Sequence, residues 1–235
     1  MLELKNVSFV VENDKEIIRN VNLKIEDGKF VVITGPNGGG KSTLARIIAG
    51  IEKPDSGRIY MDGRDITDLD ITERAALGIG YAFQQPVRFK GVTVRDLITL
   101  ASGEKISVAK ACEYLSEVGL CAKDYISRDV DSSLSGGELK RIEIATVLAR
   151  KSKISIFDEP EAGIDLWSFK NLIEVFEKIH NEINGSIVII SHQERILNIA
   201  DEIIVIAGGE IKAVGKKEDI LPELLAADDS CKFYK

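Results

Sequence analysis

The sequence predicts an α/β fold in which a parallel sheet carries helices on its faces. Residues 30–33, 154–157 and 186–190 are short, nearly continuous apolar runs. Runs of this length are typical of strands that are buried on both faces. Stretches with apolar residues at helical spacing lie between the runs, and alternation of buried strands with helices indicates a parallel sheet.

One helical segment interrupts this alternation. From residue 86 to residue 152 the apolar residues follow helical spacing only. We therefore predict an inserted helical subdomain at residues 86–152. Residues 1–85 and 153–235 would then form the core that carries the parallel sheet.

The first third of the chain is expected to form strands and one helix. Leu2, Leu4 and Val7 mark a first extended segment, and residues 17–25 alternate between apolar and polar side chains as a second strand does. The apolar run at 30–33 ends in a glycine-rich loop. A helix with Leu44 and Ile47 on one side follows, and Gly50 is placed to end it.

The rest of the chain supplies further helices and strands. The spacing predicts helices around residues 94–100, 108–118 and 139–149, with the last beginning near Glu138, and a long amphipathic helix at 166–183. Two more strands are expected at 203–206 and 211–214. The polar residues 228–232 are expected to be a loose tail.

Composition narrows the class of partner and the location. The chain has 235 residues, a formal net charge of -7 and a pI near 5.1, which argues against nucleic acid or an anionic membrane as the main partner. No apolar run reaches membrane-spanning length, and no signal peptide is recognised. The three cysteines, Cys112, Cys121 and Cys231, share no metal-binding spacing, so we expect free thiols in the cytoplasm.

A phosphate-binding loop follows the strand at 30–33. The pattern G-x-x-x-x-G-K-[ST] is matched by consecutive residues, to which we add the next threonine: Gly35, Pro36, Asn37, Gly38, Gly39, Gly40, Lys41, Ser42 and Thr43. Glycines let backbone N–H groups surround phosphate oxygens, and the start of the next helix adds unpaired donors. Lys41 would contact the β- and γ-phosphates and Ser42 would ligate Mg²⁺. The loop predicts binding of ATP or GTP.

Two carboxylates follow the strand at 154–157. Asp158 and Glu159 lie where ligands bind in open α/β sheets, at the carboxyl end of a buried strand. Asp158 suits the Mg²⁺ shell, and Glu159 suits the general base that activates water. Such a pair is common by itself, and it is the phosphate loop that favours the catalytic interpretation.

Residues 134–138 read Leu-Ser-Gly-Gly-Glu. Ser135 is placed as the N-cap of a helix whose first donors are free, and Gly136 and Gly137 allow a phosphate to come close. Alone, this is an ordinary loop. Nothing in it requires the phosphate to be the one bound by Lys41 of the same chain.

Together these motifs resemble the ABC ATPase family over essentially the whole chain. They stand in the family's order, with a glutamine after a strand at Gln84, a D-loop at residues 161–165 and a switch histidine at His192. The resemblance implies a P-loop ABC ATPase fold with a RecA-like core, an antiparallel β subdomain and the inserted helical subdomain. It also implies that ATP and Mg²⁺ are the cofactors.

The resemblance assigns further roles. Gln84 would join Ser42 and Asp158 at Mg²⁺, and His192 would contact the γ-phosphate and act with Lys41 and Glu159 in catalysis. Two copies would pair head to tail around ATP, so that Ser135, Gly136 and Gly137 act on the nucleotide of the other copy. His180, on the long helix, is expected to be structural.

Several details are similar to the SufC branch, the ATPases of iron–sulfur cluster assembly. They include residues 82–87 around Gln84, and Glu138 and Lys140 where transporter ATPases usually have glutamines. This branch implies a SufB-like or SufB–SufD scaffold as partner, and an ion pair between Lys140 and Glu159 in the nucleotide-free protein. The alternative to this ion pair is a solvated Lys140 on an exposed helix face. The alternative to the SufC branch is the ATPase subunit of a membrane ABC transporter.

Two surfaces remain to be placed. In many ABC ATPases an aromatic residue stacks on adenine, whereas here Val10 or Val11 occupies the matching position, which leaves base selectivity open. The partner surface is expected around residues 86–100, where apolar Val87 and Phe89 are mixed with basic Arg88 and Lys90.

Overall fold

The layering of the molecule follows from the side chains of β3 (Phe30–Thr34). In the computed structural model, which describes residues 1–11, 15–164, 166–182 and 185–226, every residue of this strand is buried. Phe30 and Val32 belong to one apolar cluster, whereas Val31 and Ile33 belong to a second. Because successive side chains point to opposite faces of a sheet, β3 lies between two cores.

The central sheet has six strands in the order β12-β11-β3-β10-β9-β6. Its neighbouring strands run parallel, except that β12 pairs antiparallel with β11. The other strands are β6 (Ile79–Ala82), β9 (Ile154–Asp158), β10 (Ser186–Ile190), β11 (Glu202–Ala207) and β12 (Glu210–Lys216). The predicted α/β fold is confirmed.

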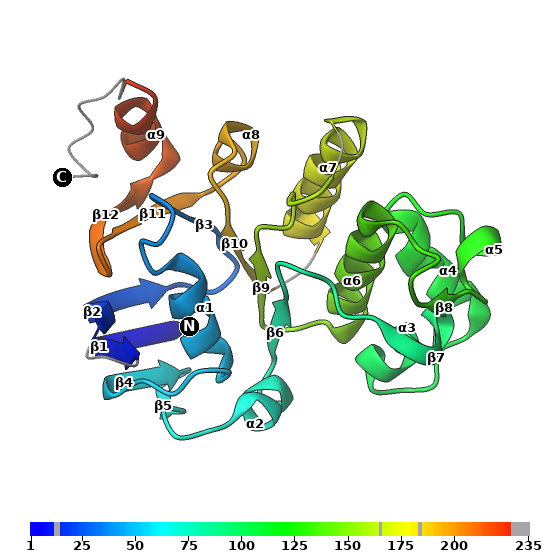
Figure 1. The fold of residues 1–235 in the computed structure, drawn as a ribbon, viewed down its shortest axis with the longest axis horizontal. Helices are drawn as coiled ribbons and strands as arrows, with labels where there is room; N and C mark the ends of the chain where they lie inside the picture. Colours follow the sequence, from blue (N-terminus) through cyan, green and yellow to red (C-terminus); the bar gives the residue numbers. More distant parts are fainter. Residues whose placement is uncertain (12–14, 165, 183–184, 227–235) are drawn as a thin grey trace.

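A second, antiparallel sheet and helix α1 (Lys41–Ala49) cover one face of the central sheet (Figure 1). This sheet has the order β2-β1-β4-β5. Its strands are β1 (Leu2–Val11), β2 (Lys15–Ile25), β4 (Ser56–Met61) and β5 (Arg64–Asp65). Gly50 ends α1 in the left-handed conformation, as expected.

Most of the other helices contribute to the second core. The chain leaves the sheet after β6 and returns at β9, which is its neighbour in the sheet. Between them lie α3 (Val94–Ser102), α4 (Val108–Glu117), α5 (Ala122–Tyr125), α6 (Gly136–Arg150) and a small sheet of β7 (Phe89–Thr93) and β8 (Asp129–Val130). Figure 1 shows α3 to α5 at the end of the molecule away from β1 and β2. The subdomain boundaries at 86 and 152 stay a prediction.

Four helices complete the fold: α2 (Ile71–Ala76), α7 (Leu166–Glu182), α8 (Glu194–Leu197) and α9 (Lys217–Leu225). The sequence predicts α7 and the strand before Gln84, which is β6, but not α2, α8 or α9, nor the strands β4, β5, β7 and β8. All of the missed elements except α9 have at most six residues, which leaves little periodicity to detect. One boundary was wrong: α6 begins at Gly136 rather than near Glu138. Ile183, Cys231 and the tail at 228–232 lie outside the described residues.

Other expectations concern single residues and the membrane. Cys112 and Cys121 are free thiols, as expected. His180 packs its ring edge-on against Phe30 and lies 3.3 Å from Asp201, which fits a structural role. Within the described ranges, no helix is long and apolar enough to cross a bilayer.

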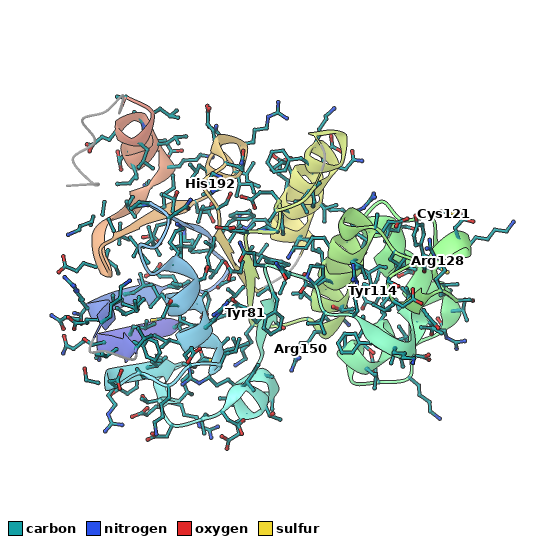
Figure 2. All side chains as sticks on the ribbon, viewed as in Figure 1. Tyr81, Tyr114, Cys121, Arg128, Arg150 and His192 are labelled. Atoms are coloured by element: carbon teal, nitrogen blue, oxygen red, sulfur yellow. The ribbon has the colours of Figure 1, made fainter. Side chains whose placement is uncertain are left out.

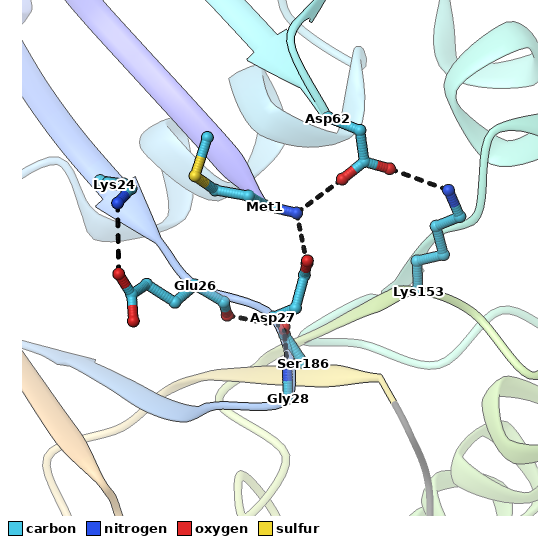
Figure 3. A network of polar contacts seen from close by, with 8 residues as sticks. All are labelled: Met1, Lys24, Glu26, Asp27, Gly28, Asp62, Lys153 and Ser186. Atoms are coloured by element: carbon cyan, nitrogen blue, oxygen red, sulfur yellow. Dashed lines mark hydrogen bonds and ion pairs between the residues drawn. The ribbon is translucent and has the colours of Figure 1, made fainter.

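A polar network joins the antiparallel sheet to the start of the central sheet (Figure 3). The Lys153 ammonium lies 2.8 Å from one oxygen of Asp62, and the Met1 amino group lies 2.7 Å from the other. The hydrogen bond from Lys153, followed by that from Met1, lowers the pKa of Asp62 to about 2. The Ser186 hydroxyl accepts from the Gly28 N–H and donates to the Glu26 carbonyl.

Arg74 is the largest fully buried side chain, and only 1% of it is exposed. Its guanidinium donates to the carbonyls of Ile47 and Ile48 at 2.6 and 2.9 Å, near the end of α1. It also donates to the carbonyls of Thr67 and Leu69. The last carbonyls of a helix have no partner within the helix, so Arg74 satisfies the end of α1 and ties it to α2.

Replacing Arg74 by methionine should therefore lower the free energy of unfolding by about 3 kcal/mol, because buried carbonyls lose their donors. Urea unfolding followed by circular dichroism measures the change. The matched control is Arg58→Met, whose side chain is 57% exposed and 3.9 Å from Asp65, and which should cost less than about 1 kcal/mol. Equal shifts for both variants would contradict the capping role of Arg74.

Candidate active site

The phosphate loop is shaped by contacts that only glycine permits. Gly35 has φ 138°, and a Cβ there would lie 1.9 Å from the Ile206 carbonyl oxygen. Gly40 has φ 102°, and a Cβ there would lie 2.9 Å from the Ile17 carbonyl oxygen. Both are conformations that residues with a side chain rarely adopt. Strands β2 and β11 therefore press directly against the loop and fix its backbone.

The loop surrounds a cavity of about 270 Å³. It is lined by Lys15, Ile17, residues 37–43 and Glu159. Helix α1 begins at Lys41, and its N-cap, Gly40, offers no side chain to the first N–H groups. These donors can therefore bind phosphate oxygens.

Lys41 lies inside the loop. Its ammonium donates to the carbonyls of Gly35 and Pro36 at 2.8 and 2.9 Å. Burial lowers the pKa of Lys41, while Glu159 and Asp158 oppose this shift. A phosphate arriving in the cavity would meet a cation that is already held in place.

The residues expected at Mg²⁺ include a direct contact. The Ser42 hydroxyl donates to Asp158 Oδ1 at 2.9 Å, and the Tyr81 hydroxyl donates to Oδ2 at 2.8 Å. Hydroxyl and carboxylate oxygens fit Mg²⁺, which usually keeps waters and substrate phosphates as its other ligands. In the part of the chain that the structure describes, no group of three or more His, Cys, Asp or Glu residues is arranged to hold a metal ion.

Glu159 stands in a strained conformation beside this pair. Its φ is 45°, in the left-handed region, and its N–H donates to the Ile190 carbonyl at 3.0 Å. The Gln84 amide donates to Glu159 Oε2 at 2.5 Å. Strain of this kind at a half-buried carboxylate is a feature of functional sites. Glu159 also lines the phosphate cavity, where a base must lie to activate water for attack on a phosphate.

His192 follows β10 and is exposed. Its neighbour Ser191 donates to Glu161 and accepts from the Gln193 N–H at 3.0 Å. Burial raises the pKa of Glu161, and this shift is opposed by the hydrogen bond from Ser191. The loops after β9 and β10 are thus joined. Asp165, the last D-loop residue, lies outside the described residues.

The signature, residues 134–138, lies apart from the phosphate cavity of its own chain. Ser135, Gly136 and Gly137 are absent from the lining of that cavity. Arg128, which lies 3.8 Å from Glu138, is labelled in Figure 2 at the right-hand end of the molecule, whereas His192 is labelled left of centre.

The start of α6 is also less free than the sequence suggests. Ser135 accepts from the Glu138 N–H, and the Glu138 carboxylate accepts from the Ser135 N–H, a reciprocal capping box. A hydrogen bond from Tyr125, the largest cause, lowers the pKa of Glu138 to about 2. The Ser135 hydroxyl must leave this cap, or share it, to contact a nucleotide.

The expected ion pair between Lys140 and Glu159 is not formed. Lys140 is 1% exposed and lies 3.0 Å from Glu143 on the same helix, and its ammonium donates to the Phe83 carbonyl. Glu159 instead accepts from Gln84. A partner three residues away on α6 requires less ordering of the chain than one on another strand, so Glu143 prevails.

Sequence reasoning missed three residues around the site: Tyr81, Arg46 and Glu143. Tyr81 holds the second oxygen of Asp158, and Arg46 on α1 interacts with the same hydroxyl. Glu143 holds Lys140. The sequence offered one indication of Tyr81, because it lies two residues before Phe83 in the strand that precedes Gln84. Only the order of strands in the sheet, which places β6 beside β9, brings it next to Asp158. Figure 2 labels Tyr81 near the middle of the molecule.

Comparisons with known proteins identify the family. A sequence profile of the ABC transporter family matches residues 18–162. An uncharacterized ABC transporter ATP-binding protein of Methanocaldococcus jannaschii is 40% identical over 219 residues, which cover 90% of this chain and 87% of that protein. The chain belongs to the ABC transporter family.

Two further similarities bear on its function. The sulfate/thiosulfate import ATP-binding protein CysA of Synechocystis sp. is 37% identical, and the match covers 91% of this chain but only 62% of CysA. A solved dimeric ATP-binding cassette in a post-hydrolysis state, bound to ADP and Pi, superposes with a TM-score of 0.82 at 28% identity. That match covers 92% of this chain and 99% of the solved one.

This ABC protein is therefore an ATPase with ATP and Mg²⁺ as its cofactors. The roles of single residues remain predictions that the geometry supports. In the structure the following residues lie together: Lys41, Ser42, Asp158, Glu159 and Gln84. The signature of the same chain lies apart from them.

Replacing Glu159 by glutamine should keep ATP binding and reduce turnover by about 10²- to 10⁴-fold, because the amide cannot accept a proton from water. Phosphate release and ATP titration measure the two effects. Glu210→Gln, which alters an exposed pair with Lys212, should keep wild-type turnover, and residual activity in Lys41→Ala would reveal any contaminating ATPase. Wild-type turnover in Glu159→Gln would remove Glu159 from the role of base.

Proposed function

We propose that the protein is the ATP-hydrolysing subunit of a membrane transporter and works on the cytoplasmic side of the membrane. Two copies would close around two ATP molecules and move a membrane-spanning partner. The observation that carries the proposal is an apolar surface directly after Gln84, next to the proposed base.

This surface, which we call the docking groove, is a cavity of about 160 Å³ lined chiefly by apolar side chains. Phe83, Val87 and Phe89 line it and remain 36%, 47% and 39% exposed. Single exposed apolar side chains need no explanation, but several that gather around a cavity indicate a site of contact with another protein. Arg88 and Lys90, the sequence neighbours of Val87 and Phe89, are exposed and add two basic side chains to this segment.

The nature of the partner rests on the comparisons. The similar proteins carry transporter and import names, and none of those described above is named SufC. They support a membrane-spanning partner. A SufB-like or SufB–SufD scaffold is the second candidate, and the specific residues that favour it are those around Gln84 together with Lys140 in the signature helix.

The paired arrangement rests on the exposed signature. Ser135 and Gly136 are exposed, and the phosphate cavity of the same chain lies elsewhere. A second copy placed head to tail would bring its signature to this cavity, as a symmetric pair allows. The dimeric form of the similar ATP-binding cassette supports this arrangement.

The Glu159→Gln variant should be monomeric without nucleotide and dimeric with ATP and Mg²⁺. ATP that is not hydrolysed would hold the phosphate loop of one copy against the signature of the other. Light scattering coupled to gel filtration measures the mass. The control is the same variant carrying Lys41→Ala, which should stay monomeric with ATP. A monomer at high concentration of Glu159→Gln, with ATP bound, would contradict the paired arrangement.

Reversing the charge of Arg88 and Lys90 should weaken partner binding and leave ATP affinity unchanged, because both residues are exposed and adjoin in sequence Val87 and Phe89, which line the docking groove. Affinity purification from native cells, with separate membrane and soluble fractions, measures the partner. Lys105→Glu with Lys123→Glu, exposed residues outside the groove lining, is the control. Recovery of a SufB-like protein from the soluble fraction would replace the transporter proposal by the second candidate.

A further inference from the structure

Helix α6 holds both polar groups of one residue at the end of β6. The Phe83 N–H donates to Glu143 Oε1 at 2.8 Å, and the Phe83 carbonyl accepts from the Lys140 ammonium. Lys140 and Glu143 lie one turn apart and pair at 3.0 Å. The Lys140 ammonium also lies 3.4 Å from the Gln84 carbonyl oxygen.

This pair is buried, which makes it a unit. The Lys140 side chain is 1% exposed and that of Glu143 is 13% exposed. Burial raises the pKa of Glu143, and Lys140 opposes the shift. A buried charge that loses its partner is costly, so the two residues keep or lose their contacts with Phe83 together.

The contacts continue into the proposed active site. Gln84 follows Phe83 directly, and its side chain donates to Glu159 Oε2 at 2.5 Å. We infer that Lys140 and Glu143 are positioning residues: by fixing the Phe83 backbone they aim the Gln84 amide at the Glu159 carboxylate. The signature helix would thus set the geometry of the base in its own chain, besides any role toward a second copy.

One member of the pair, Glu143, lies at the docking groove, and so does Phe83, since both are among the residues that line it. If the proposed function is correct, a partner seated in the groove contacts the residues that orient Gln84. The positioning role itself requires only the ATPase, so it can be tested on the isolated protein.

The decisive variant replaces both charges, Lys140→Met with Glu143→Met. Exchange of a buried ion pair for apolar residues of similar volume is often neutral for stability, so the protein should stay folded. Its kcat should fall about 10- to 100-fold, because a misplaced catalytic group loses that much. The Kd for ATP should stay unchanged, and hydrogen exchange of the Phe83 amide should become faster while α6 stays protected.

Two controls separate positioning from stability. Lys110→Met with Glu113→Met removes an exposed pair of the same spacing on α4 and should alter neither kcat nor exchange. Gln84→Ala should lower kcat by itself but add little to the charge-free double variant, because both act through one contact. If the variant with Lys140→Met and Glu143→Met does not fold, Glu143→Gln is compared with Glu143→Leu. Only Glu143→Gln keeps an acceptor for the Phe83 N–H.

A folded double variant with wild-type kcat would overturn the inference, as would losses that multiply fully with Gln84→Ala. Equal kcat and equal Phe83 exchange in Glu143→Gln and Glu143→Leu would do the same. None of these results touches the identity of the partner, which the purification from native cells tests separately.

Discussion

The rest of the structure depends on the parallel pairing of β3, β9 and β10. Ile190 pairs with Ile33 on one side and with Asp158 on the other, so the three strands end at one edge of the sheet. The phosphate loop, the pair Asp158–Glu159 and the loop of His192 follow these ends. The register is firmly fixed because every strand is buried on both faces, and a shift by one residue would turn all its side chains.

Around this edge, the backbone adopts unfavourable conformations that place the functional groups. Gly35 is squeezed against the backbone of Ile206, and Glu159 keeps a left-handed conformation. Polar contacts hold these loops: the hydroxyls of Ser42 and Tyr81 donate to Asp158, and the Gln84 amide donates to Glu159. The helical region reaches the same edge through Lys140 and Glu143 on Phe83. Elements that pack in both apolar cores therefore position the residues of the site.

Much of this could be predicted from local sequence. The buried strands are short apolar runs, and the phosphate loop is a contiguous motif whose glycines meet conformational needs within the loop. The Tyr81–Asp158 contact joins residues far apart in the sequence, so only the sheet order reveals it. The Lys140–Glu159 pair was wrong because sequence alone does not rank two acidic partners for one lysine. The motifs of this chain indicate nucleotide binding, and the residues similar to the SufC branch favour a scaffold without deciding between a scaffold and a transporter partner.

The central claim is that each ATP is hydrolysed between the phosphate loop of one copy and the signature of another. The most direct test mixes two inactive variants, Lys41→Ala and Ser135→Arg, and measures ATPase activity. In mixed pairs one composite site is intact, so an equimolar mixture should recover about a quarter of wild-type activity. A mixture no more active than its separate components would contradict the account.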